Sequence, residues 1–362
     1  PRHNRPLLPH TTGQNDLISH LVTYASQTFG VFRTHPDNTN IPSGNIGGVP
    51  SFLFGPFNNN SNAYVNFNTS NDSDILVAGS GYRTASTNTS TFTFVGDVQT
   101  GTIPVSISIG SGSIWNLIGN PYTSYMDSAA FLIDNMASLD EDAIGIYGYD
   151  GSADDDWTIL NFNTIGSTDY KMAPGQVFLV AAEGTSTLNF TAAMRTINGG
   201  DDFIVGRTMN NNAHLSIKLE SSDSNYHTDF YFNENSTKSL DPGYDAAIFN
   251  GVLPEFYMYS HLVENNEGRN MAIQSLGEND LSEVTIPIGV IANQGEAITF
   301  SINVSTLPNT VEVYLEDNIT NTFTLLNSGD YTLTPDTSLN GTGRFYLRVT
   351  TSALSIPQNS LD

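Results

Sequence analysis

Hydrophobic and polar residues alternate along much of the chain with the period of two that is typical of β-strands. Ile103–Ile109 reads IPVSISI, and Tyr82–Val98 alternates around TFTFVGDV. Successive side chains of a strand point to opposite faces of its sheet, so this pattern predicts strands with one buried and one wet face. Further strands are expected at Ile114–Ile118, Ile144–Gly151, Trp157–Phe162, Gln176–Ala182 and Thr187–Phe190.

The same pattern recurs at short intervals in the second half of the chain. Strands are expected there at residues 214–221, 229–235, 284–290, 298–305, 311–317, 322–327 and 344–350. Short strands separated by Gly, Asn, Asp and Pro turns are typical of sandwiches and jelly rolls. The sequence therefore predicts an all-β fold of two consecutive antiparallel β-sandwich or jelly-roll-like domains, or three if the first subdivides near residue 110.

Loop-forming residues suggest where these domains begin and end. We expect a linker or incomplete segment at residues 1–45, sandwich domains at 46–205 and 206–352, and a further linker at 353–362. The turn-rich run Gly199–Asp202 marks the boundary between the two domains. Leu17–Phe32 is apolar enough for a strand pair or a helix, and Ala129–Ser138 fits a short helix.

Charge excludes several classes of partner. The chain has 37 acidic residues against 12 Lys and Arg, so its net charge is −25. A surface this acidic repels phosphate backbones and anionic lipids, so we expect no nucleic-acid binding. No apolar run approaches the ~20 residues of a membrane helix, so no membrane insertion is expected. The chain has no cysteine, which excludes disulfides and thiolate chemistry.

Acidic residues cluster on both sides of the strand expected at Ile144–Gly151. Ca²⁺ takes about six to eight oxygen ligands, and two loops at one end of a sandwich can supply them together. We therefore expect either a Ca²⁺ site or a solvated acidic loop, since EF-hand spacing is absent. The candidate ligands are Asp140, Asp142, Asp150, Asp154, Asp155 and Asp156. The pair Asp241 and Asp245 is either a turn device or half of a metal site.

Aromatic residues lie close to the acidic loops in the sequence. Tyr147, Tyr149, Trp157 and Tyr170 could form a carbohydrate-binding surface, because aromatic faces stack on sugar rings. Alternate aromatic residues of a strand can equally fill a sandwich core. We expect that second role, a core anchor between sheets, for Trp115.

Motifs of known catalytic chemistry are absent. The seven histidines show no HExxH spacing, and there is no GxSxG elbow, P-loop or GxGxxG run. Hydrolysis of a glycoside needs two carboxylates across a cleft, and uronate lyases commonly need a basic groove that so few Lys and Arg would not build. We therefore expect no catalytic residues and no enzyme activity.

Two blocks of sequence resemble a known family. WNLIGNPY at residues 115–122, followed by IYGYDG, Trp157 and APGQVF at 173–178, resembles a module of large Bacteroidota surface proteins. A second block is similar to the segment that follows that module. It comprises Tyr231-Phe232, LDPGYDA at 240–246, MAIQSL at 271–276, YLED at 314–317 and GRFYL at 343–347. The resemblance covers roughly residues 80–362.

The resemblance implies a location and an export route. Such proteins usually end in a type IX secretion sorting domain reached through a short linker, and ALSIPQNSLD at 353–362 resembles that linker. It implies a secreted or cell-surface protein outside the outer membrane, with the type IX machinery as a partner through the missing sorting domain. Asp127-Ser128-Ala129 resembles the Bacteroidota O-glycosylation motif, which makes Ser128 a candidate glycosylation site.

Three functions stay open at this point. The resemblance favours a non-catalytic region that supports adhesion or surface attachment, including that of a gliding-motility adhesin, with glycans or surface proteins as partners. The alternative is a carbohydrate-binding accessory region of a polysaccharide-degrading enzyme. The third is a glycoside hydrolase or polysaccharide lyase. Apart from Ca²⁺, no cofactor is expected.

Overall fold

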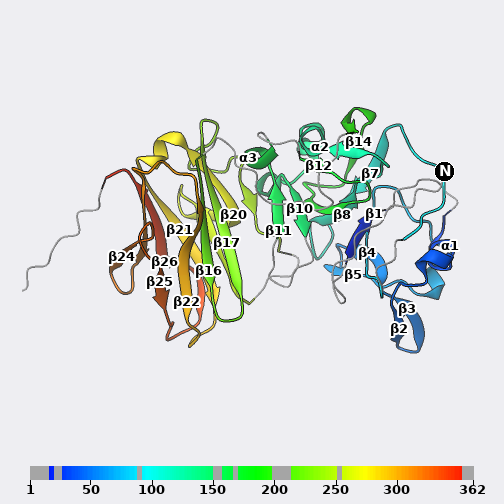
Figure 1. Cartoon of the computed structure of the whole chain (residues 1–362), viewed down its shortest axis with the longest axis horizontal. Helices are drawn as coiled ribbons and strands as arrows, with labels where there is room; N and C mark the ends of the chain where they lie inside the picture. Colours follow the sequence, from blue (N-terminus) through cyan, green and yellow to red (C-terminus); the bar gives the residue numbers. More distant parts are fainter. Residues whose placement is uncertain are drawn as a thin grey trace, which may run out of the picture. The chain divides into compact units, whose positions relative to one another are not determined.

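Strands dominate the fold, which confirms the all-β class. The computed structural model describes residues 16–19, 27–87, 92–149, 157–165, 170–197, 213–250 and 255–352. The chain forms two compact units, Pro1–Thr208 and Met209–Asp362, each with its own sheets (Figure 1). Among the described residues, no helix has the length and apolar character needed to cross a bilayer.

Several small sheets build the first unit. One contains β1 (Asp16–Ser19), β6 (Gly81–Thr84), β4 (Phe54–Asn58) and β5 (Ala63–Tyr64) in that spatial order. Another contains β11 (Trp157–Leu160), β10 (Ile146–Tyr149), β13 (Val177–Ala181) and β8 (Trp115–Gly119). Smaller sheets join β12 (Lys171–Met172), β9 (Tyr125–Asp127) and β15 (Arg195–Thr196), then β14 (Ser186–Phe190) and β7 (Ile103–Ile107), then β2 (Ser43–Ile46) and β3 (Val49–Phe52).

Short helices connect these strands. The α-helices are α1 (Phe29–Arg33), α2 (Ser128–Asn135) and α3 (Phe162–Ile165). The 3-10 turns are η1 (Pro36–Asn38), η2 (Thr69–Asn71), η3 (Met136–Ser138), η4 (Glu141–Ala143), η5 (Ala192–Met194) and, in the second unit, η6 (Glu278–Leu281). Helix α2 confirms the short helix expected at Ala129–Ser138.

An aromatic core organises the N-terminal part of the first unit. Phe29 and Phe32 on α1 are fully buried, and both rings pack against Phe54 on β4 at centroid distances of 5.2 and 5.0 Å. Thr28 caps α1 by accepting a hydrogen bond from the Val31 N–H. Residues 27–45, which the sequence pattern places in a linker or an incomplete segment, therefore include side chains of this core.

The second unit contains one long, nearly closed sheet (Figure 1). Its spatial order is β24 (Thr322–Leu325), β23 (Glu312–Asp317), β26 (Leu339–Thr350), β21 (Glu283–Ala292), β19 (Tyr257–Leu262), β20 (Glu267–Gly277), β17 (Asn225–Asn233), β16 (Ala213–Glu220), β22 (Ile298–Ser305) and β25 (Tyr331–Leu333). The short strand β18 (Ala246–Ala247) pairs with β20. β17 and β20 run parallel, whereas the other described pairings of this sheet are antiparallel.

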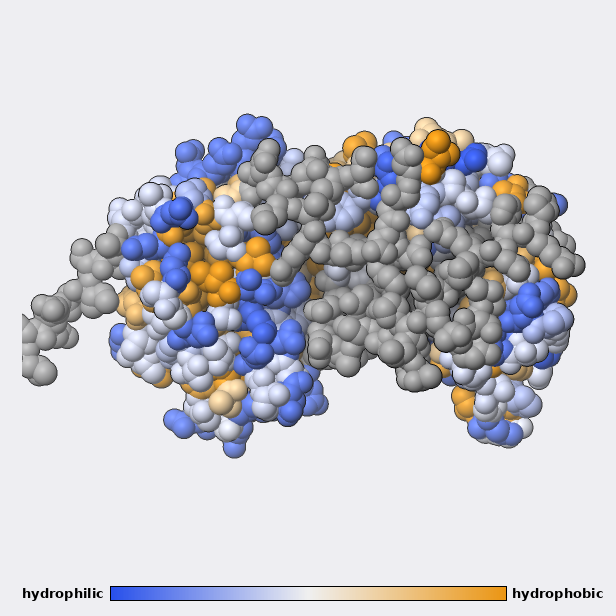
Figure 2. All heavy atoms as spheres, viewed as in Figure 1, coloured by the Kyte–Doolittle hydropathy of each residue, from blue (hydrophilic) through white to orange (hydrophobic). Residues whose placement is uncertain are grey.

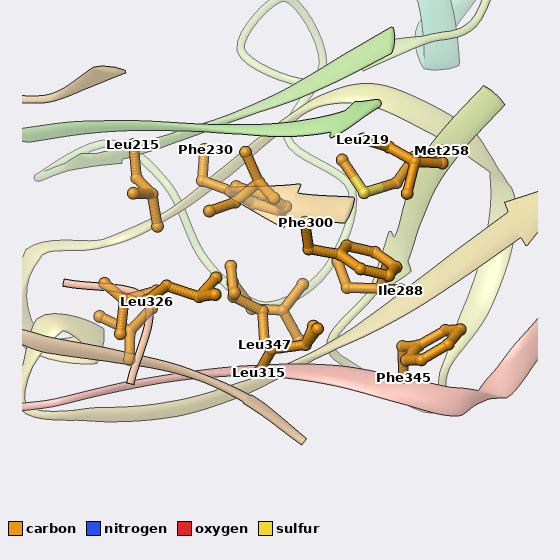
Figure 3. Close-up of a cluster of buried hydrophobic side chains, with 14 of the residues drawn as sticks. Leu215, Leu219, Phe230, Met258, Ile288, Phe300, Leu315, Leu326, Phe345 and Leu347 are labelled. Atoms are coloured by element: carbon orange, nitrogen blue, oxygen red, sulfur yellow. The ribbon is translucent and has the colours of Figure 1, made fainter. Parts of the chain in front are cut away.

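Alternate residues of these strands form the core of the second unit. Leu215, Phe230, Phe300 and Leu347 come from four different strands and are fully buried in one cluster (Figure 3). Hydrophilic residues cover much of the described surface on the face shown in Figure 2, and hydrophobic residues reach it in separate patches. Burial of alternate residues on one face of these strands is what the alternating sequence pattern predicts.

Side-chain amides replace strand partners at several places in the first unit. Residues 92–98 were expected to be part of a strand, but they form none. The Thr93 N–H donates to Asn38 Oδ1 at 2.7 Å, and Asn38 Nδ2 donates to the Thr93 carbonyl at 2.9 Å. Asn135 bonds both backbone groups of Asn189 in the same way. An amide therefore supplies the donor and acceptor that a neighbouring strand would provide.

A buried carboxylate links the two ends of the long sheet of the second unit. Asp317, at the end of β23, accepts hydrogen bonds from Arg344 Nη2 at 2.7 Å and from the Tyr331 hydroxyl at 2.8 Å. Tyr331 belongs to β25 at one end of the sheet order, whereas β23 lies next to the other end. The Ile319 N–H also donates to Asp317. Burial alone would raise the pKa of Asp317, but these donors outweigh it and lower the pKa below its usual value.

Replacing this carboxylate should weaken the second unit. We expect Asp317→Asn to lower the free energy of unfolding by about 2–4 kcal/mol, because it leaves buried donors without their charged acceptor. The control is Glu316→Gln, because Arg348, its partner, is one-third exposed, and the loss there should stay below about 1 kcal/mol. Urea unfolding of the whole chain measures both. Equal losses for the two variants would contradict the role given to Asp317.

Candidate functional site

Ionisable side chains gather on β16 and β17 in the second unit. In the antiparallel ladder His214 pairs with Tyr231, and Lys218 pairs with His227. Leu215 on β16 belongs to the core. Because neighbours along a strand alternate between faces, His214 and its ladder partner lie on the outer face of the sheet.

Asp229 joins the two histidines. Its Oδ1 lies 3.0 Å from His214 Nε2, and its Oδ2 lies 3.6 Å from His227 Nε2. The His214 ring stacks on Tyr231 with a centroid distance of 4.4 Å and an interplanar angle of 11°. The side chains of His214 and Asp229 are 15% and 18% exposed, so the surroundings hold both in place.

The electrostatics of this cluster keep the carboxylate charged. Burial acts to raise the pKa of Asp229, but the charge of His227 and the hydrogen bond and charge of His214 lower it more. The net pKa of Asp229 is therefore below its ordinary value. The arrangement orients two imidazoles around one anion.

An imidazole held by a carboxylate is a component of several hydrolytic sites, where it activates a hydroxyl nucleophile. Here both carboxylate oxygens face imidazole Nε2 atoms. The hydroxyl of Ser216, which lies opposite Asp229 in the ladder, is fully buried. The geometry thus suits fixing side chains on a sheet surface better than it suits a nucleophile that must reach a substrate.

The candidate Ca²⁺ ligands are only partly described. Asp140 is buried just before η4, where its N–H donates to the Ala181 carbonyl, and Asp142 lies half-buried within η4. The remaining candidates, Asp150, Asp154, Asp155 and Asp156, lie outside the described residues. Within the described ranges, no group of three or more His, Asp or Glu side chains has a geometry that would hold a metal ion.

The aromatic candidates take different places. Trp115 is buried, which confirms its expected role as a core anchor, and its ring meets Tyr147 edge-on at 4.6 Å. Tyr147 is itself fully buried, so no sugar can stack on it in the folded chain, and this corrects its assignment to a binding surface. Tyr149 pairs with Trp157 between β10 and β11, and their side chains lie outside the described residues. Tyr170 is half-buried against the neighbouring core.

The glycosylation candidate lies inside the fold. Ser128 is the first residue of α2 and is fully buried. The carboxylate of Asp127 caps this helix by accepting from the Ala130 N–H at 3.0 Å. An O-linked sugar needs an exposed hydroxyl, so the folded chain cannot carry one at Ser128. The DSA run instead forms the beginning of a helix, as an N-cap aspartate commonly does.

The LDPGYDA run is a turn held by its own carboxylates. Asp241 accepts a hydrogen bond from the Thr237 N–H, and burial nevertheless raises the pKa of Asp241. Asp245 accepts from the N–H groups of Asp241 and Ser275 at 2.8 and 2.6 Å. Of the two alternatives for this pair, the structure supports the turn device.

Sequence reasoning did not identify the histidine–aspartate cluster. His214 and His227 lie on different strands, and only the register of β16 against β17 brings them to one carboxylate. Alternation places His214 on an outward position of its expected strand, whereas His227 lies before the strand expected at 229–235. A predicted hairpin with this register would have been needed to find the cluster.

Residues 50–349 match a protein family described as a domain of unknown function (DUF8693), and the chain belongs to this family. Neither the curated proteins nor the solved structures include a match to the chain.

Removing the charge at the centre of the cluster tests its contribution. The stability that Asp229 supplies is present above the unfolded carboxyl pKa of 3.8 and is lost as the pH falls through the lower folded pKa. We expect Asp229→Asn to cost about 1–3 kcal/mol at pH 7, and the gap from the unsubstituted chain to narrow below about pH 4. Thermal and urea unfolding between pH 3 and 7 measure this. Asp223→Asn, in the exposed loop after β16, is the control, and an equal effect there would refute the prediction.

Proposed function

We propose that this chain is a non-catalytic region of a secreted or cell-surface bacterial protein, where its β-units act as rigid supports for adhesion or surface attachment. The observation that carries the proposal is how polar side chains of the two sequence blocks, at residues 115–178 and 231–347, are used. They hydrogen-bond to backbone groups and to other side chains of the chain itself, and so stiffen loops and strand ends.

Asn120, in the WNLIGNPY run, is the clearest example. It is fully buried, and its Nδ2 donates to the carbonyls of Ser124 and Ala173 while its Oδ1 accepts from the Tyr122 N–H. The Gly175 N–H donates to the Asn120 carbonyl. One asparagine thus joins the GNPY turn to the APGQ turn, 53 residues away in the sequence at Ala173.

The second block follows the same rule. Asp245 of LDPGYDA ties its loop to β20 through the Ser275 N–H, and Asp317 of YLED links β23 to β25 and to Arg344 of GRFYL. Each of these carboxylates accepts hydrogen bonds from other residues of the chain. Polar side chains that are used in this way support a mechanical role rather than chemistry on a substrate.

A strongly acidic surface is compatible with a role outside the cell. A net charge of −25 keeps such a chain soluble and limits pairing between exposed strand edges. The resemblance to Bacteroidota surface proteins implies that the type IX secretion machinery exports the chain. Ca²⁺ bound by the acidic run at residues 150–156 would offset part of the negative charge.

A bead assay distinguishes the three candidate functions. Beads coated with the purified chain are washed at increasing shear over glass, neutral polysaccharide and acidic polysaccharide, with carboxylated beads of equal charge as the control. We expect the coated beads to resist detachment on more than one surface. If adhesion depends on Ca²⁺ bound by the acidic run at residues 150–156, EDTA should reduce this resistance, and adding Ca²⁺ should restore it.

Other outcomes identify the alternatives. Retention on a single polysaccharide, abolished by the soluble sugar, would favour a carbohydrate-binding accessory region. Release of reducing or unsaturated ends, lost on replacing one carboxylate, would establish a glycoside hydrolase or lyase. Detachment at the same shear as the carboxylated control beads would contradict the proposal.

A further inference from the structure

The core of the second unit contains a side-chain amide without a hydrogen-bond partner. Gln274 on β20 is fully buried, and neither its Oε1 nor its Nε2 is bonded. Ser260 on β19 is also fully buried, and its Oγ is unbonded. Two unbonded side chains thus occur on neighbouring strands of one sheet.

Both side chains point into the hydrophobic core of the second unit. Gln274 pairs with Phe230 in the parallel ladder of β17 and β20, and paired residues share a face of the sheet. Ser260 pairs with Ile288 of β21. Phe230 and Ile288 belong to the hydrophobic core shown in Figure 3, so their polar partners face the same interior.

These residues lie where the sheet divides. β20 pairs with β19 as far as Ser260 opposite Met271, and from Ile273 onward it pairs with β17 instead. At this division the Thr228 hydroxyl of β17 donates to the Met258 carbonyl of β19 at 3.1 Å. A side-chain hydrogen bond thus crosses this division, while Gln274 and Ser260 on the strands that part there have no such bond.

An unbonded amide in an apolar core is costly, because it has lost its hydrogen bonds to water and gained none in exchange. Buried polar groups in folded proteins are bonded to protein or to ordered water in the large majority of cases. Water is small and can donate and accept twice, which matches an amide oxygen, an amide NH₂ and a hydroxyl. We propose that Gln274 and Ser260 form an internal binding site for ordered water in the core of the second unit.

Substitution of the amide shows whether it is bonded to water or has no hydrogen-bond partner, because the Tm should change in opposite directions in the two cases. Gln274→Met keeps a similar volume and removes both polar groups. If water is bound, its hydrogen bonds are lost and the Tm of the whole chain should fall by about 2–4 °C. If the amide is an orphan, removing it relieves the burial cost. An unchanged or higher Tm would therefore overturn the proposal.

Two further measurements keep the result specific. Leu276→Met, at the next core-facing position of β20, measures the effect of a methionine in this core. The Tm of Gln274→Met must be lower than the Tm of Leu276→Met. NMR should show magnetisation transfer from long-lived water to the Gln274 side-chain NH₂ in the unsubstituted chain. The double variant Gln274→Met with Ser260→Ala should lose less than the sum of the single losses. No transfer, or additive losses, would contradict a shared water site.

Discussion

Backbone N–H and C=O groups that have no neighbouring strand must find another partner, and here buried Asn and Asp side chains provide many of them. Asn38 bonds both backbone groups of Thr93, Asn120 joins two turns, and Asp317 accepts from the Ile319 N–H just after β23. Without cysteine, no disulfide can fix these connections. The loops and edges of both units therefore depend on polar side chains whose hydrogen bonds replace missing strands.

The strands themselves could be predicted, because their period of two reflects burial on one face. Ile103–Ile107 and Trp115–Gly119 are strands where the pattern places them. Residues 92–98 show the limit of this reasoning. Phe92 and Thr93 are both buried there, and the neighbour of this segment is the amide of Asn38 rather than a strand. The local sequence pattern indicates which residues are buried, but it does not indicate which groups form hydrogen bonds with the backbone N–H and C=O groups.

Some features of the candidate sites follow from local sequence, whereas others depend on contacts between distant residues. Burial of Trp115 follows from its place on an apolar strand, whereas the burial of Tyr147 depends on packing against that tryptophan. His214, His227 and Asp229 meet through the register of two strands, which no local pattern contains. The pairing of β20 with β17, which places Gln274 in the core, connects residues more than 40 positions apart. Long-range register is therefore the information that sequence reasoning lacked.

If side-chain amides replace strand partners, the backbone N–H groups that they bond must be protected from exchange with solvent as well as those of a sheet. Residue-resolved hydrogen exchange of the whole chain measures this directly. We expect the N–H groups of Thr93 and Tyr122, which donate to Asn38 and Asn120, to exchange as slowly as the strand N–H of Leu347. Exchange of both at the rate of the exposed turn residue Gly47 would contradict it.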